Sequence, residues 1–444
     1  MAAPQKFLLP DRTIDTLDAY LAGGGGEGLQ KALAMPRQQV LTELKRAGLR
    51  GRGGAGFPTA VKWNTVASSP CPTKYFVCNA AEGEPGTFKD RTLIGRNPYQ
   101  LIEGIQIGAY AIDARKCYIG MKASFENAYL RLRDALAQMA ARKMIHVPVE
   151  LVRGPEDYLL GEERALLEVI EGKEAMPREA DNPPYILGLF TRMLYDVYEP
   201  NPAVVDNAET VCNVPHILRN GPDWYRSMGT ADTPGTMVFT ISGDVRTPGV
   251  YELPMGTTLR ELIDVWGGGP RPGRRVKAVF SGVTNPVITA DHLDVALDFG
   301  SMRRIGSGLG SGGYIVYDDA ACMVRVAYRY AEFLWLESCG QCTSCKDGGH
   351  TATLHLKKLV DGRGSGVDVA AAVQAAVKAP SGTRCFLPSE LAAIVPSVVD
   401  NYGDEFVAHF GRGCRDCADL MVPKMAAYDE ATKTFSYTHG RTTP

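Results

Sequence analysis

The stretch Gly48–Trp63, GLRGRGGAGFPTAVKW, decides between two folds for the first part of this chain. Its glycine pattern G-x-G-x-x-G, from Gly51 to Gly56, matches the fingerprint of a dinucleotide-binding Rossmann crossover. That fingerprint requires a strand before it and a helix that opens at its last glycine. Here the preceding segment, PRQQVLTELKRAGL, carries apolar residues at helical spacing, and Phe57-Pro58 after the loop favours a turn. The pattern therefore predicts a helix, a glycine loop and a second helix, and it excludes a standard Rossmann fold.

The glycines of this loop still need a physical reason. Glycine leaves backbone N–H groups bare and permits positive φ, so consecutive amides can point at one anion. Arg52 within the loop and Lys62 just beyond it add positive charge. The loop is therefore a candidate phosphate cradle, and a flexible surface loop is the alternative.

Bulk composition is that of an ordinary globular protein. The chain has 444 residues, 45% apolar and 22% charged, with a net charge of −2. This length corresponds to about three domains. No long basic or acidic run indicates nucleic acid or a membrane surface as a partner. The N-terminal apolar core, Phe7–Leu9, is too short for a signal peptide, and no run of about 18 apolar residues occurs, so we expect a cytoplasmic protein without membrane insertion.

Four regions differ in pattern along the chain. Residues 1–35 predict a helical lead-in with the glycine run Gly23–Gly26. Residues 36–235 alternate helical segments with the apolar strand candidates KYFVCNA, KCYIGM and HVPVELVRG, which predicts an α/β layer structure. Residues 236–318 predict two strands around a Pro-Gly turn, then a short helix with a threonine cap and a glycine stop. Residues 319–444 predict helices.

The spacing of the cysteines indicates a metal centre. An odd count of 11, in a chain for which we expect no leader, argues against a disulfide framework. The segment ESCGQCTSC presents Cys339, Cys342 and Cys345 with two-residue spacers, one thiolate short of the four that a [4Fe-4S] cluster takes. Cys385 is the nearest downstream candidate for the fourth ligand. A zinc site and a redox dithiol are the alternatives.

A second pair, Cys414-Arg-Asp-Cys417, is a weaker signal. It fits a reserve ligand pair, a contact with a partner, or two ordinary helix cysteines. The sequence favours the last of these.

Six motifs together resemble the flavin- and NADH-binding subunit of respiratory complex I, the 51-kDa or F-type subunit, and its relatives in soluble NAD-linked hydrogenases and formate dehydrogenases. In the family's order, they are GLRGRGGAGFPT, CNAAEGEPGTFKDR, GEERALLEVIEG, ISGDVRTPGVYELPMGTTLRELI, GSGLGSGGYIV and ESCGQCTSC. The similarity runs from about Gly48 to about Phe410. It implies an FMN-binding α/β domain over 36–235 that is not a standard Rossmann fold, a ubiquitin-like β-grasp domain over 236–318, and a helical bundle over 319–444 that carries a [4Fe-4S] cluster.

The resemblance also implies the residues of the sites. The glycine loop would hold the FMN phosphate beside the nicotinamide, Phe57 would lie near the NADH channel, and Glu84 would lie on the nicotinamide side. The other flavin and nucleotide residues, carried over position by position, are Gly51, Arg52, Gly53, Gly54, Lys62, Asn79, Glu82, Tyr158, Gly161, Glu162, Glu163, Asp206, Asn207, Glu209 and Thr210. The cluster ligands would be Cys339, Cys342, Cys345 and Cys385. No side chain has to act as a strong acid or base, since the flavin accepts the hydride.

The function that the resemblance implies is that of an NADH dehydrogenase subunit with FMN, NAD(H) and a [4Fe-4S] cluster as cofactors. A flavin takes two electrons and a cluster takes one, so the pair converts a hydride into single electrons. A single cluster stores only one electron, so an acceptor protein is required. In the family this partner is a thioredoxin-like [2Fe-2S] subunit, usually with a larger iron–sulfur or catalytic subunit.

Two positions depart from the family pattern. Ala81 stands where an Asp is usual, and Asp206 stands where the first Asn of a pair is usual. These changes leave three alternatives open. The nucleotide is NADPH and not NADH, the chain belongs to a formate dehydrogenase, hydrogenase or other complex, or the chain is an electron relay that has lost its nucleotide site. The segment from Pro177 to Val205 is longer than the family's, which leaves Tyr185 and Phe190 as candidates for the aromatic on the adenine side.

Overall fold

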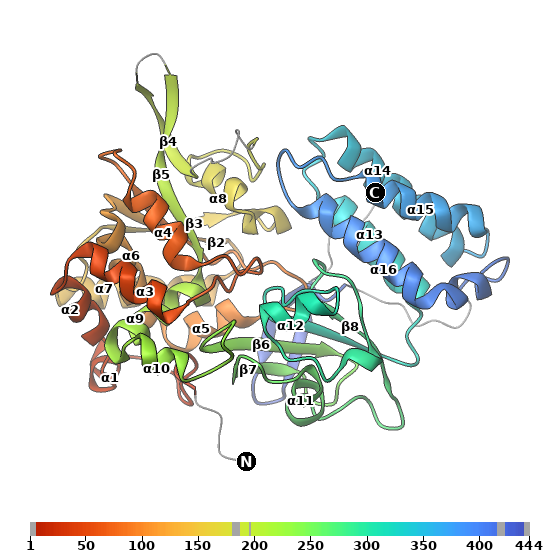
Figure 1. The fold of residues 1–444 in the computed structure, drawn as a ribbon, viewed down its shortest axis with the longest axis horizontal. Helices are drawn as coiled ribbons and strands as arrows, with labels where there is room; N and C mark the ends of the chain where they lie inside the picture. Colours follow the sequence, from red (N-terminus) through yellow and green to blue (C-terminus); the bar gives the residue numbers. More distant parts are fainter. Residues whose placement is uncertain (1–5, 180–186, 195–196, 415–421, 439–444) are drawn as a thin grey trace. The chain divides into compact units, whose positions relative to one another are not determined.

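A five-stranded sheet organises the first part of the chain (Figure 1). The computed structural model describes residues 6–179, 187–194, 197–414 and 422–438. Its contacts divide the chain into unit 1 (Met1–Glu82, Phe88–Phe239 and Val250–Gly256) and unit 2 (Gly83–Thr87, Thr240–Gly249 and Thr257–Pro444). The sheet of unit 1 has the order β3-β2-β1-β5-β4, with β1 (Tyr75–Asn79), β2 (Lys116–Lys122), β3 (Val149–Gly154), β4 (Gly188–Leu194) and β5 (Val197–Asn207).

The connections of this sheet create one reversal. The strands β3, β2, β1 and β5 are parallel, and only β4 runs antiparallel, as the hairpin partner of β5. The chain moves from β1 outward to β3 and then returns to the other side of β1 as β5. In open parallel sheets, ligands bind outside the carboxyl ends of the strands at such a reversal.

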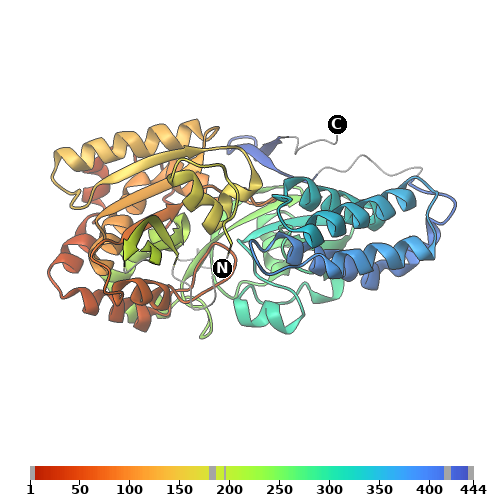
Figure 2. The same cartoon turned by 90° about the horizontal axis from the view of Figure 1, so that it is seen from above.

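Helices cover this sheet, as Figure 2 shows from a second direction. The helix α6 is almost wholly buried, begins at Pro98 behind the Asn97 cap, and contacts β1 and α9. A Cβ at Gly108 would lie 2.3 Å from the Phe76 ring, and one at Gly104 would lie 2.3 Å from the Val211 carbonyl, so only glycine permits this packing. The helices of unit 1 are α1 (Leu17–Ala22), α2 (Glu27–Leu33), α3 (Arg37–Ala47), α4 (Thr59–Ala67), α5 (Lys89–Arg96), α6 (Pro98–Ile112), α7 (Glu126–Ala141), η1 (Tyr158–Gly161), α8 (Glu163–Ile170), α9 (Ala208–Asn220) and α10 (Pro222–Arg226).

A second sheet has the order β7-β6-β10-β8-β9. Its strands are β6 (Thr236–Gly243), β7 (Gly249–Pro254), β8 (Val276–Ser281), β9 (Ile288–Thr289) and β10 (Gly313–Asp318). The strand β10 is parallel to β6 and antiparallel to β8. The Thr258 side chain accepts a hydrogen bond from the N–H of Glu261 and so starts α11 (Leu259–Glu261), as the threonine predicted. The chain continues through η2 (Leu262–Trp266), η3 (Ala290–His292) and α12 (Phe299–Arg304).

Four helices form a bundle in unit 2: α13 (Met323–Glu337), α14 (Thr343–Val360), α15 (Gly366–Lys378) and α16 (Leu387–Ala408). Contacts join α13 to α14 and α16, and join α15 to the same two helices. Ser365 and Asp368 form a capping box at the start of α15. Tyr402 departs from helical backbone angles and bends α16 in its last turns.

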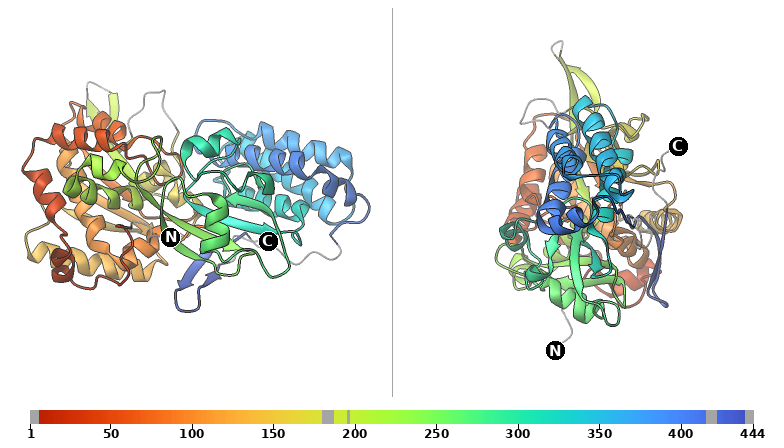
Figure 3. Two further views of the ribbon diagram at one scale, coloured as in Figure 1. Left: turned by 60° about the horizontal axis from the view of Figure 1, so that its bottom comes forward. Right: turned by 90° about the vertical axis from the view of Figure 1, so that its right-hand side faces the viewer.

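The prediction of a purely helical C-terminal region is wrong in one respect. A hairpin of β11 (Met425–Asp429) and β12 (Thr434–Tyr437) follows the bundle and forms its own two-stranded ribbon (Figure 3). Its alternation of small and polar residues was too weak a strand signal. The Rossmann alternative is excluded as expected, because α3 and α4 flank the glycine loop. Among the described residues, no helix has the length and apolarity needed to cross a membrane.

Candidate cofactor sites

The carboxyl ends of β1 and β5 lie side by side at the reversal of the first sheet. The strand register pairs Asn79 with Asn207 and Cys78 with Asp206. Asn207 is also the N-cap of α9, where its side chain accepts from the N–H of Glu209. A helix N-terminus offers donors and a positive dipole end to an anion. Two predicted site residues, 128 positions apart by their numbers, therefore meet at the sheet edge that most favours a ligand.

The glycine loop reaches this same edge. A Cβ at Gly53 would lie 3.1 Å from the Cβ of Asn207. The N–H of Arg52 donates to the Thr210 hydroxyl over 2.8 Å, and the N–H of Gly51 donates to the Phe57 carbonyl over 2.9 Å. Since those two N–H groups already bond within the protein, the loop has the N–H groups from Gly53 onward to offer to an anion. The positive φ of Gly54, 126°, suits such an arrangement.

The guanidinium of Arg52 does not supply the loop with surface charge, contrary to expectation. The side chain is fully buried, and it donates to the Tyr225 hydroxyl and to the carbonyls of Pro234 and Thr236 over 2.9–3.2 Å. Its charge therefore anchors the loop from within. The expectation was wrong because sequence shows a basic residue in a loop but not the direction of its side chain.

The ammonium group of Lys62 lies among acidic groups at the end of β5. Its ammonium donates to the Val205 carbonyl over 2.8 Å and lies 3.2 Å from Glu163 and 3.9 Å from Asp206. The Asp206 carboxylate is buried and accepts from the Trp63 indole over 2.5 Å. Burial raises the pKa of Asp206 to about 6, although Lys62 and Trp63 lower it. This Asp, where the family has Asn, can therefore change its charge near neutral pH.

A buried ionic network lies behind this edge, and it includes residues that the sequence did not identify. The Lys89 ammonium is 1% exposed and contacts Asp90 (2.9 Å), Glu209 (2.9 Å) and the Asn207 amide oxygen (3.1 Å). The Asn207 amide in turn donates to Asp90 over 2.6 Å. Burial raises the pKa of Asp90 to about 6 against the opposing effect of Lys89. Trp63, Lys89 and Asp90 all lie next to or within quoted motifs, but only the fold brings them to Asp206 and Asn207.

The remaining predicted residues of unit 1 divide by role. The Asn79 amide donates to the Gly161 carbonyl over 2.8 Å, which ties the end of β1 to the turn of η1 that contains buried Tyr158. The Glu162 carboxylate caps α8 through two backbone N–H groups, and burial raises its pKa. Glu82 caps α5 in the same manner and pairs with Arg91 over 3.0 Å. Both carboxylates therefore accept from the backbone at the start of a helix.

Four aromatic or acidic residues of the prediction remain: Glu84, Phe57, Phe190 and Tyr185. Glu84 belongs to unit 2, where its carboxylate accepts from the Val283 N–H (2.7 Å) and the Thr284 hydroxyl (2.9 Å). Phe57 is half exposed, as a residue beside a channel can be. Phe190 makes ring contacts with Tyr75 and Tyr118 in unit 1, whereas Tyr185 lies outside the described residues.

The four predicted cluster cysteines converge at one end of the bundle. Cys339 follows α13, Cys342 caps α14, Cys345 lies in its first turn, and Cys385 precedes α16. A hydrogen bond with Cys385 lowers the pKa of Cys339 to about 5 and raises that of Cys385. Burial raises the pKa of Cys345, with Cys339 and Cys342 adding to the effect. Cys345 interacts electrostatically with the other three thiols, and Cys339 also interacts with Cys385. Four thiols from three helix ends are the donor set that an iron–sulfur cluster requires.

Cys414 is not an ordinary helix cysteine, contrary to expectation. It lies beyond the end of α16 and packs against Cys322 and His409. Cys417 lies outside the described residues.

The fold and the two sites define an iron–sulfur flavoprotein. The glycine loop fits a phosphate-bearing flavin because a side chain at Gly53 would fill the space beside Asn207. Residues 44–216 match the family model of the Nuo51 FMN-binding domain, residues 238–286 match the SLBB domain, and residues 325–409 match the NADH-ubiquinone oxidoreductase-F iron-sulfur binding region.

Comparison with known proteins gives the family. The chain is 41% identical to the F-type subunit 2 of the NADH-quinone oxidoreductase of Rhizobium meliloti, covering 88% of this chain and 94% of that relative. It is 35% identical to the NADP-reducing hydrogenase subunit HndC of Solidesulfovibrio fructosivorans, covering 89% and 81%. A crystal structure of NAD+-reducing NiFe hydrogenase superposes with a TM-score of 0.78 at 31% identity, covering 90% of this chain and 67% of that one. The chain belongs to the family of the F-type subunits of NADH-quinone oxidoreductases.

These findings confirm the predicted resemblance, the α/β fold class, and FMN and a [4Fe-4S] cluster as the cofactors of the family. The relatives are subunits of multi-subunit oxidoreductase or hydrogenase complexes, so partner subunits are implied as well.

Proposed function

We propose that this chain is the NADH-oxidising, or NAD+-reducing, electron-transfer subunit of a larger complex. When bound, FMN supplies hydride chemistry and the [4Fe-4S] cluster supplies one-electron transfer. The single observation that carries the proposal is the convergence of the glycine loop, the ends of β1 and β5, and the start of α9 on one edge of the sheet.

The chain's own residues bind and orient. Gly53, Gly54 and the N-terminus of α9 form an anion site for the flavin phosphate, and Asn79, Asn207 and Lys62 line the adjoining sheet edge. The Lys89 network fixes the side chain of Asn207 from behind, with both of its polar atoms bonded. Arg52 and Thr210 hold the loop onto α9. Each of these residues positions a cofactor group, and none has to transfer a proton.

Cys339, Cys342, Cys345 and Cys385 hold the cluster. A single cluster stores one electron, so the chain requires an acceptor protein. We propose that this acceptor is a thioredoxin-like [2Fe-2S] subunit, with a larger iron–sulfur or catalytic subunit beyond it. The assembly would work in the cytoplasm, or at the periphery of a membrane complex.

An anaerobic titration of the purified, FMN- and iron-loaded chain tests this proposal. Bleaching of the visible flavin absorbance by NADH supports it. Bleaching by NADPH alone favours the alternative in which the nucleotide is NADPH. The similarity to an NADP-reducing hydrogenase subunit is the observation that supports this alternative. A flavin that responds to neither nucleotide would show that the nucleotide site is lost, and the proposal would fail.

A further inference from the structure

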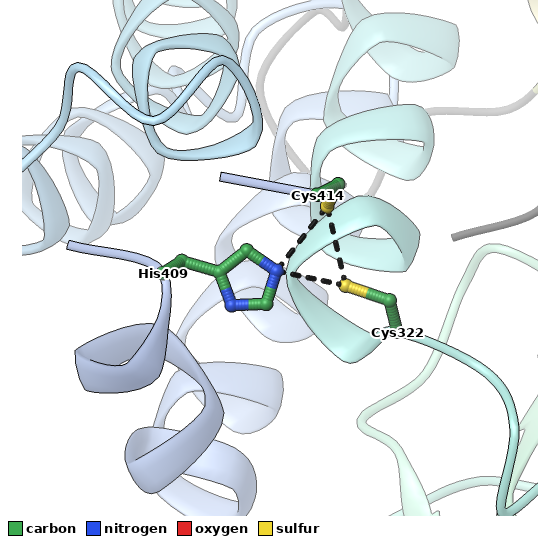
Figure 4. A group of neighbouring side chains, drawn as sticks. All are labelled: Cys322, His409 and Cys414. Atoms are coloured by element: carbon green, nitrogen blue, oxygen red, sulfur yellow. Dashed lines mark hydrogen bonds between the residues drawn. The ribbon is translucent and has the colours of Figure 1, made fainter. Parts of the chain in front are cut away.

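Three metal-binding side chains meet at a place that the cofactor sites do not use (Figure 4). Cys322 is the N-cap of α13, His409 is the C-cap of α16, and Cys414 lies in the loop that follows. The His409 Nε2 atom lies 3.2 Å from each sulfur, and the two sulfurs lie 3.4 Å apart. Three ligand atoms, from residues that include two cysteines 92 positions apart in the chain, thus face one point.

The imidazole of His409 is oriented as a metal ligand. Its Nδ1 atom lies 2.6 Å from the Glu405 carbonyl oxygen. A carbonyl can only accept, so the proton is on Nδ1 and the lone pair of Nε2 points at the two sulfurs. Metal-bound histidines commonly make this second hydrogen bond to a backbone carbonyl, because it fixes the tautomer and the ring.

Backbone contacts hold the three ligands in place. The Cys414 N–H donates to the Val360 carbonyl at the end of α14 over 2.9 Å. Gly413 has a φ of +66°, and a Cβ there would lie 2.6 Å from the Gly362 nitrogen, so the loop can make this approach only with glycine. The Glu405 carboxylate accepts from the N–H of Met323, one residue after Cys322, over 3.1 Å. The ends of α13, α14 and α16 are therefore joined here.

We propose that Cys322, His409 and Cys414 bind a Zn2+ ion. Tetrahedral zinc with bonds of about 2.3 Å to sulfur and 2.0–2.1 Å to nitrogen places two sulfurs about 3.8 Å apart and a sulfur and a nitrogen about 3.6 Å apart. The separations in the structure are shorter by only a few tenths of an ångström. Thiolate and imidazole ligands in tetrahedral geometry suit zinc. Binding deprotonates both thiols and releases two protons to solvent.

The site lies at the opposite end of α13 from the cluster cysteines. Cys322 precedes this helix of 15 residues and Cys339 follows it, so a rise of 1.5 Å per residue separates the two ends by about 22 Å. Zinc has no redox chemistry, and we assign the ion a structural role that fastens three helix ends. Cys417 follows Cys414 at a spacing common in zinc sites but lies outside the described residues, and the proposal commits to the three described ligands.

Metal analysis of the full-length chain, prepared without oxygen, tests the site independently of flavin or NADH. We expect one zinc ion per chain in addition to the cluster iron. Cys322→Ser and His409→Gln should each remove the zinc and retain the iron. Cys339→Ala should do the reverse, and Cys71→Ser, at a buried cysteine outside both groups, should keep both metals.

X-ray absorption at the zinc edge identifies the zinc ligands in the unmodified protein. This measurement tests the site even if a variant fails to fold. We expect at least two sulfur ligands and at least one nitrogen ligand. Three outcomes would overturn the proposal: a chain that retains no zinc after incubation with zinc and dialysis, zinc that is lost with Cys339→Ala and not with Cys322→Ser, or a Cys322–Cys414 disulfide in the oxygen-free preparation.

Discussion

Asp206 shows how one substitution in the family pattern changes the electrostatics of a site. Its carboxylate is buried at the end of β5, with Trp63 and Lys62 as its partners. The family's Asn would carry no charge at this position, whereas burial raises the pKa of Asp206 to about 6. The site can therefore gain a negative charge as the pH rises through about 6.

We predict that Asp206→Asn stabilises the protein more at high pH than at low pH. A carboxyl whose folded pKa of about 6 exceeds its unfolded value of 3.8 destabilises the fold increasingly as pH rises from 3.8 to 6, and by a constant amount above that. The raised pKa of Asp206 lowers the free energy of unfolding by about 3 kcal/mol at pH 8 and by about half of that at pH 5. The new amide can still accept from Trp63.

Thermal unfolding at pH 5 and pH 8 measures this difference. Asp134→Asn is the control, since the side chain of Asp134 is 58% exposed and is spared the burial cost. An Asp206→Asn variant with the same gain at both pH values would show that the carboxylate is not buried in the way described.

At the scale of elements, the glycine loop and α9 act together. The loop is held by the Arg52–Thr210 bond and reaches Asn207 closely at Gly53. The φ of Gly53 is not in the left-handed region, so the need for glycine there comes from space and not from backbone strain.

We predict that Gly53→Ala weakens FMN binding by at least tenfold, because the new methyl group meets Asn207 at 3.1 Å and occupies part of the anion site. A tenfold loss corresponds to about 1.4 kcal/mol. FMN affinity is measured by quenching of flavin fluorescence. Gly95→Ala in α5 is the matched control, since a Cβ there meets nothing within 4 Å. Equal affinity in both variants would contradict the placement of the phosphate at this loop.

The helix ends of the bundle give a second prediction. Cys385→Ala removes the proposed ligand that precedes α16, so we expect the loss of most cluster iron and sulfide. We expect FMN binding to be unchanged, because the FMN site that we propose lies in unit 1. Cys117→Ala, at a buried cysteine of β2, is the control. An intact cluster in Cys385→Ala would reject Cys385 as the fourth ligand.

Local patterns predicted several elements and failed where distant segments meet. Helical spacing predicted α3, a threonine cap predicted the start of α11, and apolar segments predicted β1, β2 and β3. The burial of Lys89 with Asn207, 118 positions away, has no local signal, because a lysine beside an aspartate is usually exposed. The grouping of Cys322 with Cys414 was missed for the same reason. Arg52 was expected to add positive charge to the glycine loop, because the sequence does not show the direction of a side chain.

At the scale of the whole molecule, one chain carries two kinds of redox site on separate structural units. Unit 1 provides the glycine loop and the sheet edge, and unit 2 provides the four cluster thiols. The division matches the chemistry, since the two-electron and one-electron steps need different cofactors. We predict that the two sites work in sequence, so that loss of one ligand cysteine disconnects the second step and leaves the first intact.

Electron paramagnetic resonance of the FMN- and iron-loaded chain after anaerobic addition of NADH shows whether electrons pass from the flavin to the cluster within this chain. We expect NADH to bleach the flavin and to produce the signal of a reduced [4Fe-4S] cluster in the unmodified chain. We expect Cys385→Ala to retain the bleaching without the signal. The contradicting result would be an unmodified chain that holds both cofactors and whose flavin NADH reduces, but that gives no cluster signal. Electrons would then not pass from flavin to cluster within this protein.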